Sequence, residues 1–427
     1  MSKIKIRWQK EEFELEIPST IAELTEVLEK ATSVPGDRQK LLGVPGGKLT
    51  NVAQLKDGMK LTLLGTPAEK QLVTPVEKVR FVEDLTSEEV ARLTKQRKVE
   101  ERGSAGLANL GNTCYANSVV QVMASLDEFR DTVSGKLEEF PRNVEGTLAR
   151  RLGEVMKEMK QATSEATVTP MGFLTALRAR FPDFGRRDAT GNFQQQDAEE
   201  CWRGILEAVG GVMGQEKVDE FFGFDVRIPG KAGLERQRIM LCHLGTQTAV
   251  VNHLQEGLRL SLSDANAGTS EVANLPPYLT VQFARFAWKA RSETAGTEAT
   301  RTKVTRKCTF PKTLDLHDFL TAELKTKLAE TRERRAQRKL EDAEAAAAAG
   351  EATGFYELKA IVSHQGRSAE GGHYVAWVRA SKDVWLKFDD DIVSEVGDWT
   401  RLEQAGIQGG LADSQMAYFV VYQRETL

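Results

Sequence analysis

The segment GLANLGNTCYANS, residues 106–118, decides how the larger part of this chain is interpreted. Its glycines and asparagines predict a loop, and helical spacing begins at Cys114. The apolar residues on the buried face of that helix are expected to be Tyr115, Val119, Val122, Met123 and Leu126. At a helix start, unpaired backbone N–H groups and the helix dipole favour the thiolate, the nucleophilic form of cysteine. The sequence therefore predicts that Cys114 is a nucleophile.

Two amide side chains precede this cysteine. Asn109 and Asn112 lie on a loop that glycines make flexible. A thiolate that attacks a carbonyl group creates a tetrahedral oxyanion, which hydrogen-bond donors must stabilise. Both asparagines are candidates for that donor.

A second segment, GGHYVAWVRASKDVWLKFDDD at 371–391, supplies a base. His373 begins one predicted strand and Asp389 ends the next, so antiparallel pairing would bring them together. A nucleophilic thiol needs a base and a group that orients that base. Asp390 and Asp391 are rivals of Asp389 for the orienting role.

These two segments, together with QQQDAEECW at 194–202, resemble the signature motifs of the ubiquitin-specific protease family. Each motif is many residues long and their order along the chain is the order in that family. The resemblance spans residues 103–427 and implies a papain-like catalytic domain made of thumb, palm and fingers. It implies hydrolysis of the peptide or isopeptide bond after the C-terminal glycine of ubiquitin.

The resemblance also implies roles for individual residues. Cys114, His373 and Asp389 would form the catalytic triad, with Asn109 as the oxyanion donor. The residues expected to bind the extended tail of ubiquitin are Gln196, Asp197, Gly371, Gly372 and Tyr374. Because that tail ends in two glycines, a narrow channel would exclude side chains by steric rejection.

The middle motif has a structural explanation as well. Asp197 is expected to cap a helix, and apolar residues follow at helical spacing: Ala198, Trp202, Ile205, Leu206 and Val209. Cys201 lies beside that stripe and is interpreted as a packing residue.

Residues 1–66 form a separate pattern of strand, strand, helix, strand and strand. This order resembles the ubiquitin-like β-grasp fold. The chain continues beyond it, so the unit would be a docking module and not a conjugated tag. Residues 67–102 are rich in charge, contain Pro67 and Pro75, and are expected to be a linker.

Helical patterns open the remainder and strands close it, which indicates an α+β domain. The expected strands are Tyr278–Ala287, Tyr356–Ser363, His373–Arg379, Val384–Phe388 and Ala417–Tyr422. Residues 290–303 and 322–353 are interpreted as insertions, and the second is expected to be a solvated helix or a disordered insert.

Composition narrows the function classes. The 427 residues are 41% hydrophobic and 28% charged with a net charge of -4, which does not favour nucleic acid or a membrane surface as partner. Without a signal-peptide pattern or a spanning apolar run, the expected location is the cytoplasm and the nucleus. The four cysteines occur singly, and Cys242-His243 with His253 is too irregular for zinc, so no metal or cofactor is expected.

Further phrases resemble the proteasome-associated branch of the family: RQKLLGVPGGKL (38–49), KVRFVEDLTSEE (78–89), LPPYLTVQFARF (275–286) and SHQGRSAEGGHYVAWVR (363–379). The expected partners are thus ubiquitin, ubiquitinated proteins and the regulatory particle of the 26S proteasome, the last through the N-terminal unit. A ubiquitin-binding scaffold is the first alternative, but no triad member is missing. A general papain-like protease is disfavoured because His373 follows Cys114 by 259 residues (373 minus 114), against about 130–150 in that pattern.

Overall fold

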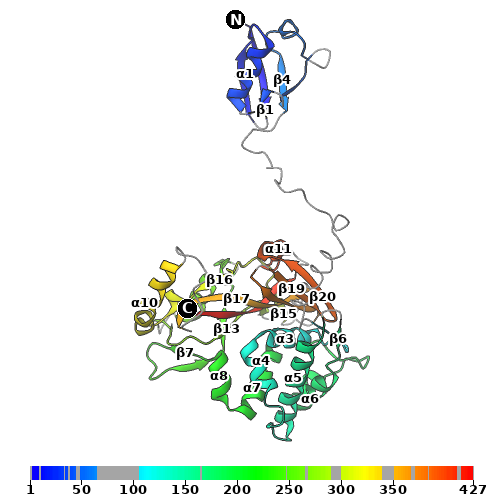
Figure 1. The fold of residues 1–427 in the computed structure, drawn as a ribbon, viewed down its shortest axis with the longest axis vertical. Coiled ribbons are helices and arrows are strands. Elements are labelled where there is room, and N and C mark those ends of the chain that lie inside the picture. Colours follow the sequence, from blue (N-terminus) through cyan, green and yellow to red (C-terminus); the bar gives the residue numbers. More distant parts are fainter. Residues whose placement is uncertain are drawn as a thin grey trace, which may run out of the picture. The chain divides into compact units, whose positions relative to one another are not determined.

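A computed structural model describes the chain at residues 2–8, 11–32, 34–36, 39–44, 49–64, 105–163, 166–246, 248–264, 268–289, 300–338, 351–366, 371–382, 384–410 and 415–426. The chain divides into two compact units, residues 1–93 and 94–427 (Figure 1). The expected linker at 67–102 lies outside the described residues.

The N-terminal unit has the β-grasp pattern that the sequence predicts. Its elements are β1 (Lys3–Trp8), β2 (Glu11–Glu16), α1 (Ile21–Thr32), β3 (Lys40–Leu42), the 3-10 turn Val52–Gln54 and β4 (Lys60–Leu64). The sheet order is β2-β1-β4-β3, with β1 and β4 parallel. Alternation buries one face of the sheet against α1, and the core contains Ile4, Ile6, Leu24, Leu28, Leu61 and Leu63.

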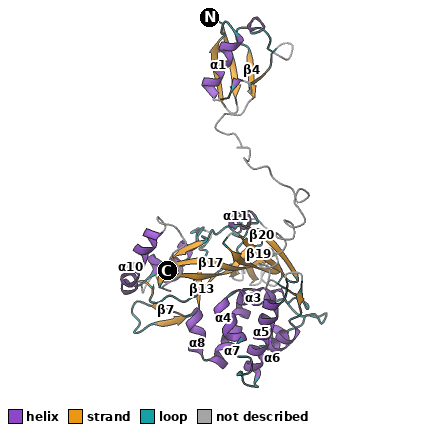
Figure 2. Cartoon of the chain, viewed as in Figure 1, coloured by secondary structure: helices purple, strands orange, loops and turns teal. Residues whose placement is uncertain are grey.

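The second unit begins with a layer of helices (Figure 2). These are α3 (Cys114–Ser125), α4 (Asp127–Ser134), α5 (Val144–Gln161), α6 (Met171–Arg180), α7 (Ala198–Met213) and α8 (Gln215–Phe222). The helix α3 is buried along most of its length, since α5 and α7 pack on it from the helical side and β17 and β18 from the other. Its first residue, Cys114, therefore lies at the junction of helices and sheet.

A large, mainly antiparallel sheet carries the rest of the core. Its order is β20 (Ile392–Gly397), β19 (Val384–Asp389), β18 (His373–Ser381), β17 (Ala352–Gln365), β21 (Met416–Thr426), β13 (Tyr278–Phe283) and β9 (Ile239–Cys242), with β16 (Thr313–Asp315) paired to β17. Both faces of its central strands are buried, one against the helices and one against a second apolar cluster. The α+β prediction is confirmed, and the helical layer and the sheet correspond to thumb and palm.

Smaller elements surround the sheet. A three-stranded sheet corresponds to short fingers, in the order β12 (Glu271–Val272), β7 (Phe224–Arg227) and β8 (Glu235–Gln237). The others are β5 (Gly106–Leu107), β6 (Thr167–Val168), the 3-10 turn Pro182–Gly185, α9 (Leu254–Leu262), β10 (Ser263–Asp264), β11 (Gly268–Thr269), β14 (Phe286–Lys289), β15 (Thr300–Lys303), the 3-10 turn His317–Phe319, α10 (Ala322–Arg338) and α11 (Trp399–Gln404).

One predicted strand is broken in two. The run expected at Tyr278–Ala287 ends as β13 at Phe283 and resumes as β14 at Phe286. Between them Arg285 is fully buried and donates hydrogen bonds to the carbonyl oxygens of Ala417 and Val304, at 2.6 and 3.0 Å. The guanidinium turns inward to satisfy these carbonyl groups, and this interrupts the strand.

The helix α10 is not simply solvated. Leu328, Thr331 and Arg335 are buried in it, and the guanidinium groups of Arg332 and Arg335 stack on the ring of Phe355 at 4.4 and 3.6 Å from its centroid. The expectation of an exposed helix is therefore wrong for residues 322–338, because long basic side chains cover apolar surface with their stems. Residues 339–350 of that insertion lie outside the described residues.

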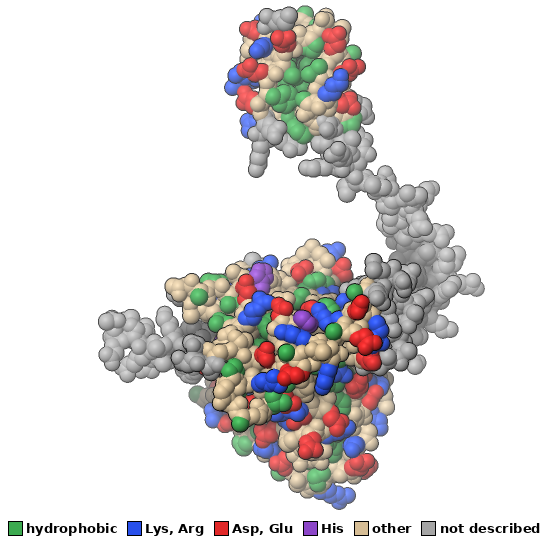
Figure 3. Space-filling model, turned by 90° about the vertical axis from the view of Figure 1, so that its left-hand side faces the viewer, with side chains coloured by type: hydrophobic (Ala, Val, Ile, Leu, Met, Phe, Trp, Pro, Cys, Tyr) green, Lys and Arg blue, Asp and Glu red, His purple; other side chains and the backbone are tan. Residues whose placement is uncertain are grey.

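Among the described residues, no helix is long and apolar enough to span a bilayer. On the face of the second unit drawn in Figure 3, acidic and basic side chains are interspersed. That face carries no broad region of one charge sign, in keeping with the near balance of 58 basic and 62 acidic residues in the sequence.

Candidate active site

Cys114 is the first residue of α3 and is nearly buried, with 3% of its surface exposed. The preceding residue, Thr113, makes no capping hydrogen bond to the helix through its side chain. The first N–H groups of α3 are thus not capped by the side chain that normally does so. The thiol lies beside donors that favour negative charge, as the sequence predicts.

The loop before Cys114 is held by one side chain. The Oδ1 atom of Asn109 accepts hydrogen bonds from the backbone N–H groups of Gly111 and Thr113, at 3.0 and 3.3 Å. Gly111 and Asn112 both have positive φ, 94° and 51°, which a glycine and an asparagine tolerate. The loop therefore turns back on the side chain of Asn109, which holds the backbone just before the start of α3.

The two candidate amides have different partners. Asn112 donates its Nδ2 to the carbonyl oxygen of Phe193, at 2.7 Å, which ties it to another loop. Asn109 donates one Nδ2 hydrogen to Asp390 Oδ2, at 2.7 Å, and this amide nitrogen carries a second hydrogen. Asn112 is thus tied to a separate loop, whereas Asn109 is tied to the carboxylate that follows Asp389.

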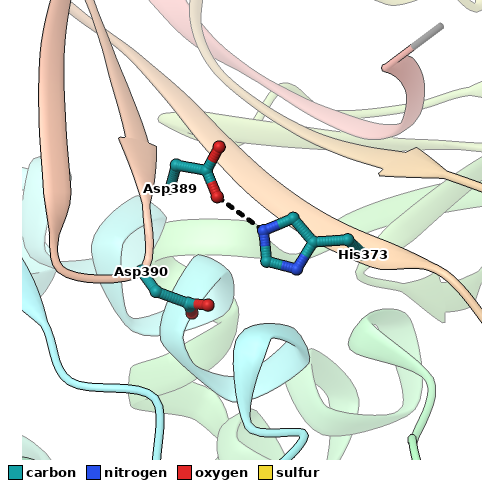
Figure 4. A group of neighbouring side chains, drawn as sticks. All are labelled: His373, Asp389 and Asp390. Carbon is teal, nitrogen blue, oxygen red and sulfur yellow. Dashed lines mark hydrogen bonds and ion pairs between the residues drawn. The ribbon is translucent and has the colours of Figure 1, made fainter.

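His373 and Asp389 meet across adjacent strands. The Nε2 atom of His373 lies 2.5 Å from Asp389 Oδ1, and this is the contact drawn in Figure 4. Lys387 holds the other carboxylate oxygen, Oδ2, at 2.7 Å. The Cys114 side chain lies close enough to the imidazole to act on its pKa.

These contacts change the protonation of the pair. The hydrogen bond that His373 donates to Asp389, followed by the interaction with Cys114, raises the pKa of His373 to about 10. The hydrogen bond with His373 lowers the pKa of Asp389 to about 2, with Lys387 acting in the same direction. At neutral pH the site therefore contains an imidazolium beside a carboxylate.

The other two carboxylates of the DDD run have other positions. Asp390, at a φ of 55°, accepts hydrogen bonds from the Nδ2 groups of Asn109 and Asn117, at 2.7 and 2.8 Å. Asp391 is exposed, and its backbone lies against Gly106, where any Cβ atom would collide with it. The structure thus brings Asp389 to the imidazole and Asp390 to the asparagine.

His373, Asp389 and Asp390 also offer ligand-type atoms within 4.8 Å of one another. The imidazole is bonded to Asp389, while the Asp390 carboxylate is held by two amide groups. Each group thus already has a hydrogen-bond partner within the protein. The chemistry that this set supports is acid–base work on a neighbouring thiol.

The QQQD segment lies next to the histidine loop. Gln195 donates its Nε2 to the carbonyl oxygen of Gly372, a contact that the sequence reasoning did not include. Asp197 caps α7 through the N–H groups of Glu199 and Glu200 and accepts the hydroxyl of Tyr418, at 2.8 Å. Gln196, between them, is half-buried. The QQQD motif marks this segment of the sequence, but it does not show which of its glutamines reaches Gly372.

The other residues expected at a substrate channel surround the same loop. Gly371 and Gly372 are half-buried, and Gly372 has a φ of 146° that favours glycine. A Cβ atom on Gly372 would collide with the ring of His364, 2.5 Å away. Tyr374 is buried, and its ring lies 4.6 Å from that of His364. Tyr374 therefore forms part of the wall behind the loop.

The remaining cysteines are packed in the core. Cys201 lies in the helical cluster and Cys242 and Cys308 in the second cluster, and all three are fully buried. The Cys242 thiol donates to the carbonyl oxygen of Leu254, at 3.8 Å. His253 contacts Thr309 instead of a cysteine. The packing interpretation of Cys201 agrees with this burial.

The assembled groups are a thiol at a helix start, an imidazole, an orienting carboxylate and an amide donor. Such a set performs nucleophilic acyl transfer. A family model described as "Ubiquitin carboxyl-terminal hydrolase" matches residues 105–422 of the chain.

Three similar proteins cover the chain from end to end. Ubiquitin carboxyl-terminal hydrolase 6 of Schizosaccharomyces pombe is 32% identical over 500 residues, with 100% of both chains covered. Ubiquitin carboxyl-terminal hydrolase 6 of Arabidopsis thaliana is 30% identical over 505 residues, with 99% of both covered. Ubiquitin carboxyl-terminal hydrolase 14 of Caenorhabditis elegans is 27% identical over 486 residues, with 99% of this chain and 94% of the other covered.

Proposed function

Because the chain belongs to the ubiquitin carboxyl-terminal hydrolase family and is a thiol-dependent deubiquitinating peptidase, we propose that it trims ubiquitin from substrates held at the proteasome. We propose further that Cys114 is its nucleophile, His373 its base and Asp389 the residue that orients the base. The observation that carries this assignment is the 2.5 Å contact between His373 and Asp389, with Cys114 close enough to the same imidazole to raise its pKa.

In the proposed reaction the proton of the Cys114 thiol resides on His373, and the thiolate attacks the carbonyl carbon of ubiquitin's last glycine. A C–S bond forms and the carbonyl oxygen becomes an oxyanion. Collapse breaks the C–N bond while His373 gives its proton to the leaving amine. Water, activated by the same imidazole, then hydrolyses the thioester and frees both ubiquitin and enzyme.

We propose that the side-chain amide of Asn109 and the backbone N–H of Cys114 donate hydrogen bonds to the oxyanion. Asp390 supports this assignment because it holds one Nδ2 hydrogen of Asn109 and thereby fixes the direction of the other. A donor that is oriented before the reaction stabilises the transition state without reorganisation at that moment. Asp390 is thus proposed as a positioning residue for the amide.

We expect that Asn109→Ala slows turnover by about two to three orders of magnitude, because one oxyanion donor is lost. The decrease should appear in kcat, since the oxyanion forms only after substrate binds. The measurement is the steady-state hydrolysis of a ubiquitin C-terminal fluorogenic amide. Asn112→Gly is the matched control: it removes the other amide and tolerates the φ of 51°. A larger loss in Asn112→Gly than in Asn109→Ala would contradict the assignment.

The substrate side of the proposal rests on the QQQD segment and the glycine pair. Gln195 holds the carbonyl group of Gly372, so the segment before α7 and the loop before His373 are joined across the site. Gln196, Asp197, Gly371, Gly372 and Tyr374 are proposed to line or support the passage for a tail that ends in two glycines. A passage bounded by such close backbone contacts would admit glycine and reject larger side chains.

The proteasome part of the proposal rests on the N-terminal unit and on the resemblance over the full chain length. Leu42 and Leu64 are 42% and 46% exposed on β3 and β4. The strand register, Lys40↔Leu64 and Leu42↔Thr62, puts these leucines on the same outer face of the sheet. An apolar pair beside lysines is typical of a protein-binding surface with a polar rim.

We expect that Leu42→Asp in the full-length chain weakens binding to purified 26S proteasome by at least about tenfold, because it buries a charge in an apolar contact. The measurement is co-sedimentation or surface-based binding with purified proteasome. Val27→Asp is the control, since Val27 is also exposed, at 39%, but lies on α1. Equal binding of wild type and Leu42→Asp, or a loss confined to Val27→Asp, would refute this surface.

Domain boundaries and location follow as parts of the same proposal. We propose a docking domain at 1–66, a linker at 67–102 and a catalytic domain at 103–427, acting where proteasomes are found, in the cytoplasm and the nucleus. The deciding experiment is labelling with a ubiquitin that carries a thiol-reactive group at its C-terminus, with and without purified proteasome. Labelling at Cys114 that increases with proteasome supports the whole proposal, and labelling at another cysteine, or none, refutes the catalytic part.

A further inference from the structure

Lys303 lies outside the proposed triad but reaches the loop before His373. It is the last residue of β15, and it pairs with Phe286 across the β14–β15 hairpin. The edge of the Phe286 ring contacts His364, with the ring centroids 5.6 Å apart. Both residues of this cross-strand pair thus contact the same buried histidine of β17.

The amino group of Lys303 makes three contacts. Its Nζ atom lies 2.7 Å from His364 Nδ1, 2.8 Å from the carbonyl oxygen of His364 and 2.9 Å from that of Gly366. In its charged form the amino group has three hydrogens and can donate one to each of these three acceptors. Lys303 therefore bridges β15 to the end of β17 through every donor it has.

The bridge lies at the base of the loop that leads to the proposed base. In the β17–β18 hairpin, His364 pairs with Tyr374 and Gln365 pairs with His373, and this second pair closes the loop. Lys303 binds one residue before and one residue after Gln365. The opposite side of the loop is held by Gln195 through the carbonyl group of Gly372. The backbone of His373 is thus fixed between two side-chain contacts from distant parts of the sequence.

The partners of Lys303 are neutral groups. Burial lowers the pKa of His364 to about 3, so the imidazole is uncharged at neutral pH and its Nδ1 accepts the hydrogen. Burial also lowers the pKa of Lys303 to about 7, and Arg285 acts in the same direction. Within the described part of the chain no carboxylate contacts Lys303. The three acceptors compensate for the desolvation of the Lys303 amino group, and they determine where that group must lie.

We propose that Lys303 is a positioning residue for the peptidase reaction, which joins the β14–β15 hairpin to the closing rung of the β17–β18 hairpin and so fixes the backbone that carries His373. This inference rests on the proposed role of His373. Without the amino group, the carbonyl oxygen of Gly366 and the Nδ1 atom of His364 lose their donor. The closing rung is then less restricted, and the imidazole samples positions that do not meet Cys114.

The test uses the full-length chain with Lys303→Met, which keeps the length of the side chain and removes all three donors. Lys303→Arg restores donors, and Lys307→Met is the matched control because Lys307 is exposed on the segment after β15. Hydrolysis of a ubiquitin C-terminal fluorogenic amide gives kcat and KM. Alkylation of Cys114 by iodoacetamide, followed by mass spectrometry of its peptide, reports on the thiol–imidazole pair without ubiquitin.

We expect Lys303→Met to lower kcat about ten- to a hundredfold, as small misplacements of a reacting group do, with KM changed less than about threefold. Iodoacetamide should label Cys114 more slowly in that variant. Lys303→Arg should recover at least about a third of the wild-type kcat, and Lys307→Met should match wild type. A structural defect alone would instead lower the fraction of folded protein. It would then reduce the hydrolysis and alkylation rates together, and Lys303→Arg at an equal melting temperature would not restore them.

The proposal is overturned if folded Lys303→Met keeps kcat within about twofold of wild type, if its loss lies in KM, or if Lys303→Arg is as slow as Lys303→Met. Should Lys303→Met fail to fold by circular dichroism, Lys303→Gln, which retains one donor group, replaces it under the same criteria. The proposed function fails separately, either if the wild-type chain does not turn over the amide or if Cys114→Ala keeps the wild-type activity.

Discussion

Replacing Cys114 with alanine is expected to reduce turnover of a ubiquitin C-terminal amide by about five to six orders of magnitude, because loss of a nucleophile removes the covalent route entirely. The side chain is small and nearly buried at the start of α3, so alanine fits without disturbing the packing. Affinity for ubiquitin should stay within about threefold of wild type, measured by calorimetry. Hydrolysis rates from enzyme titrations give the first quantity.

Cys201→Ala is the control for this variant. Cys201 is also buried and also belongs to a helix, α7, but burial raises its pKa and disfavours its thiolate. It should therefore keep near wild-type turnover, apart from any loss of stability from the cavity, which is about 1 kcal/mol for a small buried side chain. Turnover above about a hundredth of the wild-type rate in Cys114→Ala would show that another residue is the nucleophile.

The sequence was sufficient for the parts of the molecule that short-range patterns encode. The β-grasp order of residues 1–64 follows from alternation and one amphipathic helix, and the strands that begin at His373 and end at Asp389 follow from turn residues and period two. A cysteine at a helix start is likewise local information. These features depend on neighbours within a few residues, so they can be predicted without coordinates.

What the sequence left open depends on contacts between distant segments. The choice among Asp389, Asp390 and Asp391 needs the strand register and the φ of 55° at Asp390, which turns consecutive side chains in different directions. Gln195 reaches Gly372 across 177 residues of sequence. The break at Arg285 depends in part on the carbonyl group of Ala417, which is 132 positions away. Propensity cannot report such pairings.

Other contacts between distant segments hold residues that neighbour the proposed catalytic groups, or hold those groups themselves. Asp390 holds Asn109, and Lys303 with Gln195 holds the loop before His373. A catalytic group is effective only when its surroundings restrict its position to the productive geometry. The supporting residues therefore come from elements far apart in the sequence, because restricting a side chain requires contacts from several directions.

Asp389→Ala provides the sharpest test of this arrangement. It removes the contact at 2.5 Å that orients the imidazole, and we expect turnover to fall by about three to four orders of magnitude, since the loss of an orienting carboxylate is large but smaller than that of the nucleophile. Asp390→Ala should instead resemble Asn109→Ala, with a loss of about two to three orders of magnitude, because it frees the amide and leaves the imidazole in place. Equal losses in Asp389→Ala and Asp390→Ala, or a larger loss in the second, would contradict the two separate roles.

The same variant should change a titration in a direction that the geometry specifies. Asp389 raises the pKa of His373 from 6.5 to about 10, so Asp389→Ala should lower it toward the ordinary value, as measured by NMR of the imidazole.

The stability that the pair contributes is present in full below pH 6.5, where an unfolded histidine is already protonated, and is lost as pH rises toward 10. On the acid side it is present above pH 3.8 and is lost as Asp389 is protonated toward pH 2. The difference in unfolding free energy between wild type and Asp389→Ala should therefore be greatest between about pH 4 and 6.5 and should shrink on both sides. A difference that grows from pH 6.5 to 9 would mean that His373 is held neutral, and the imidazolium assigned to this site would be wrong.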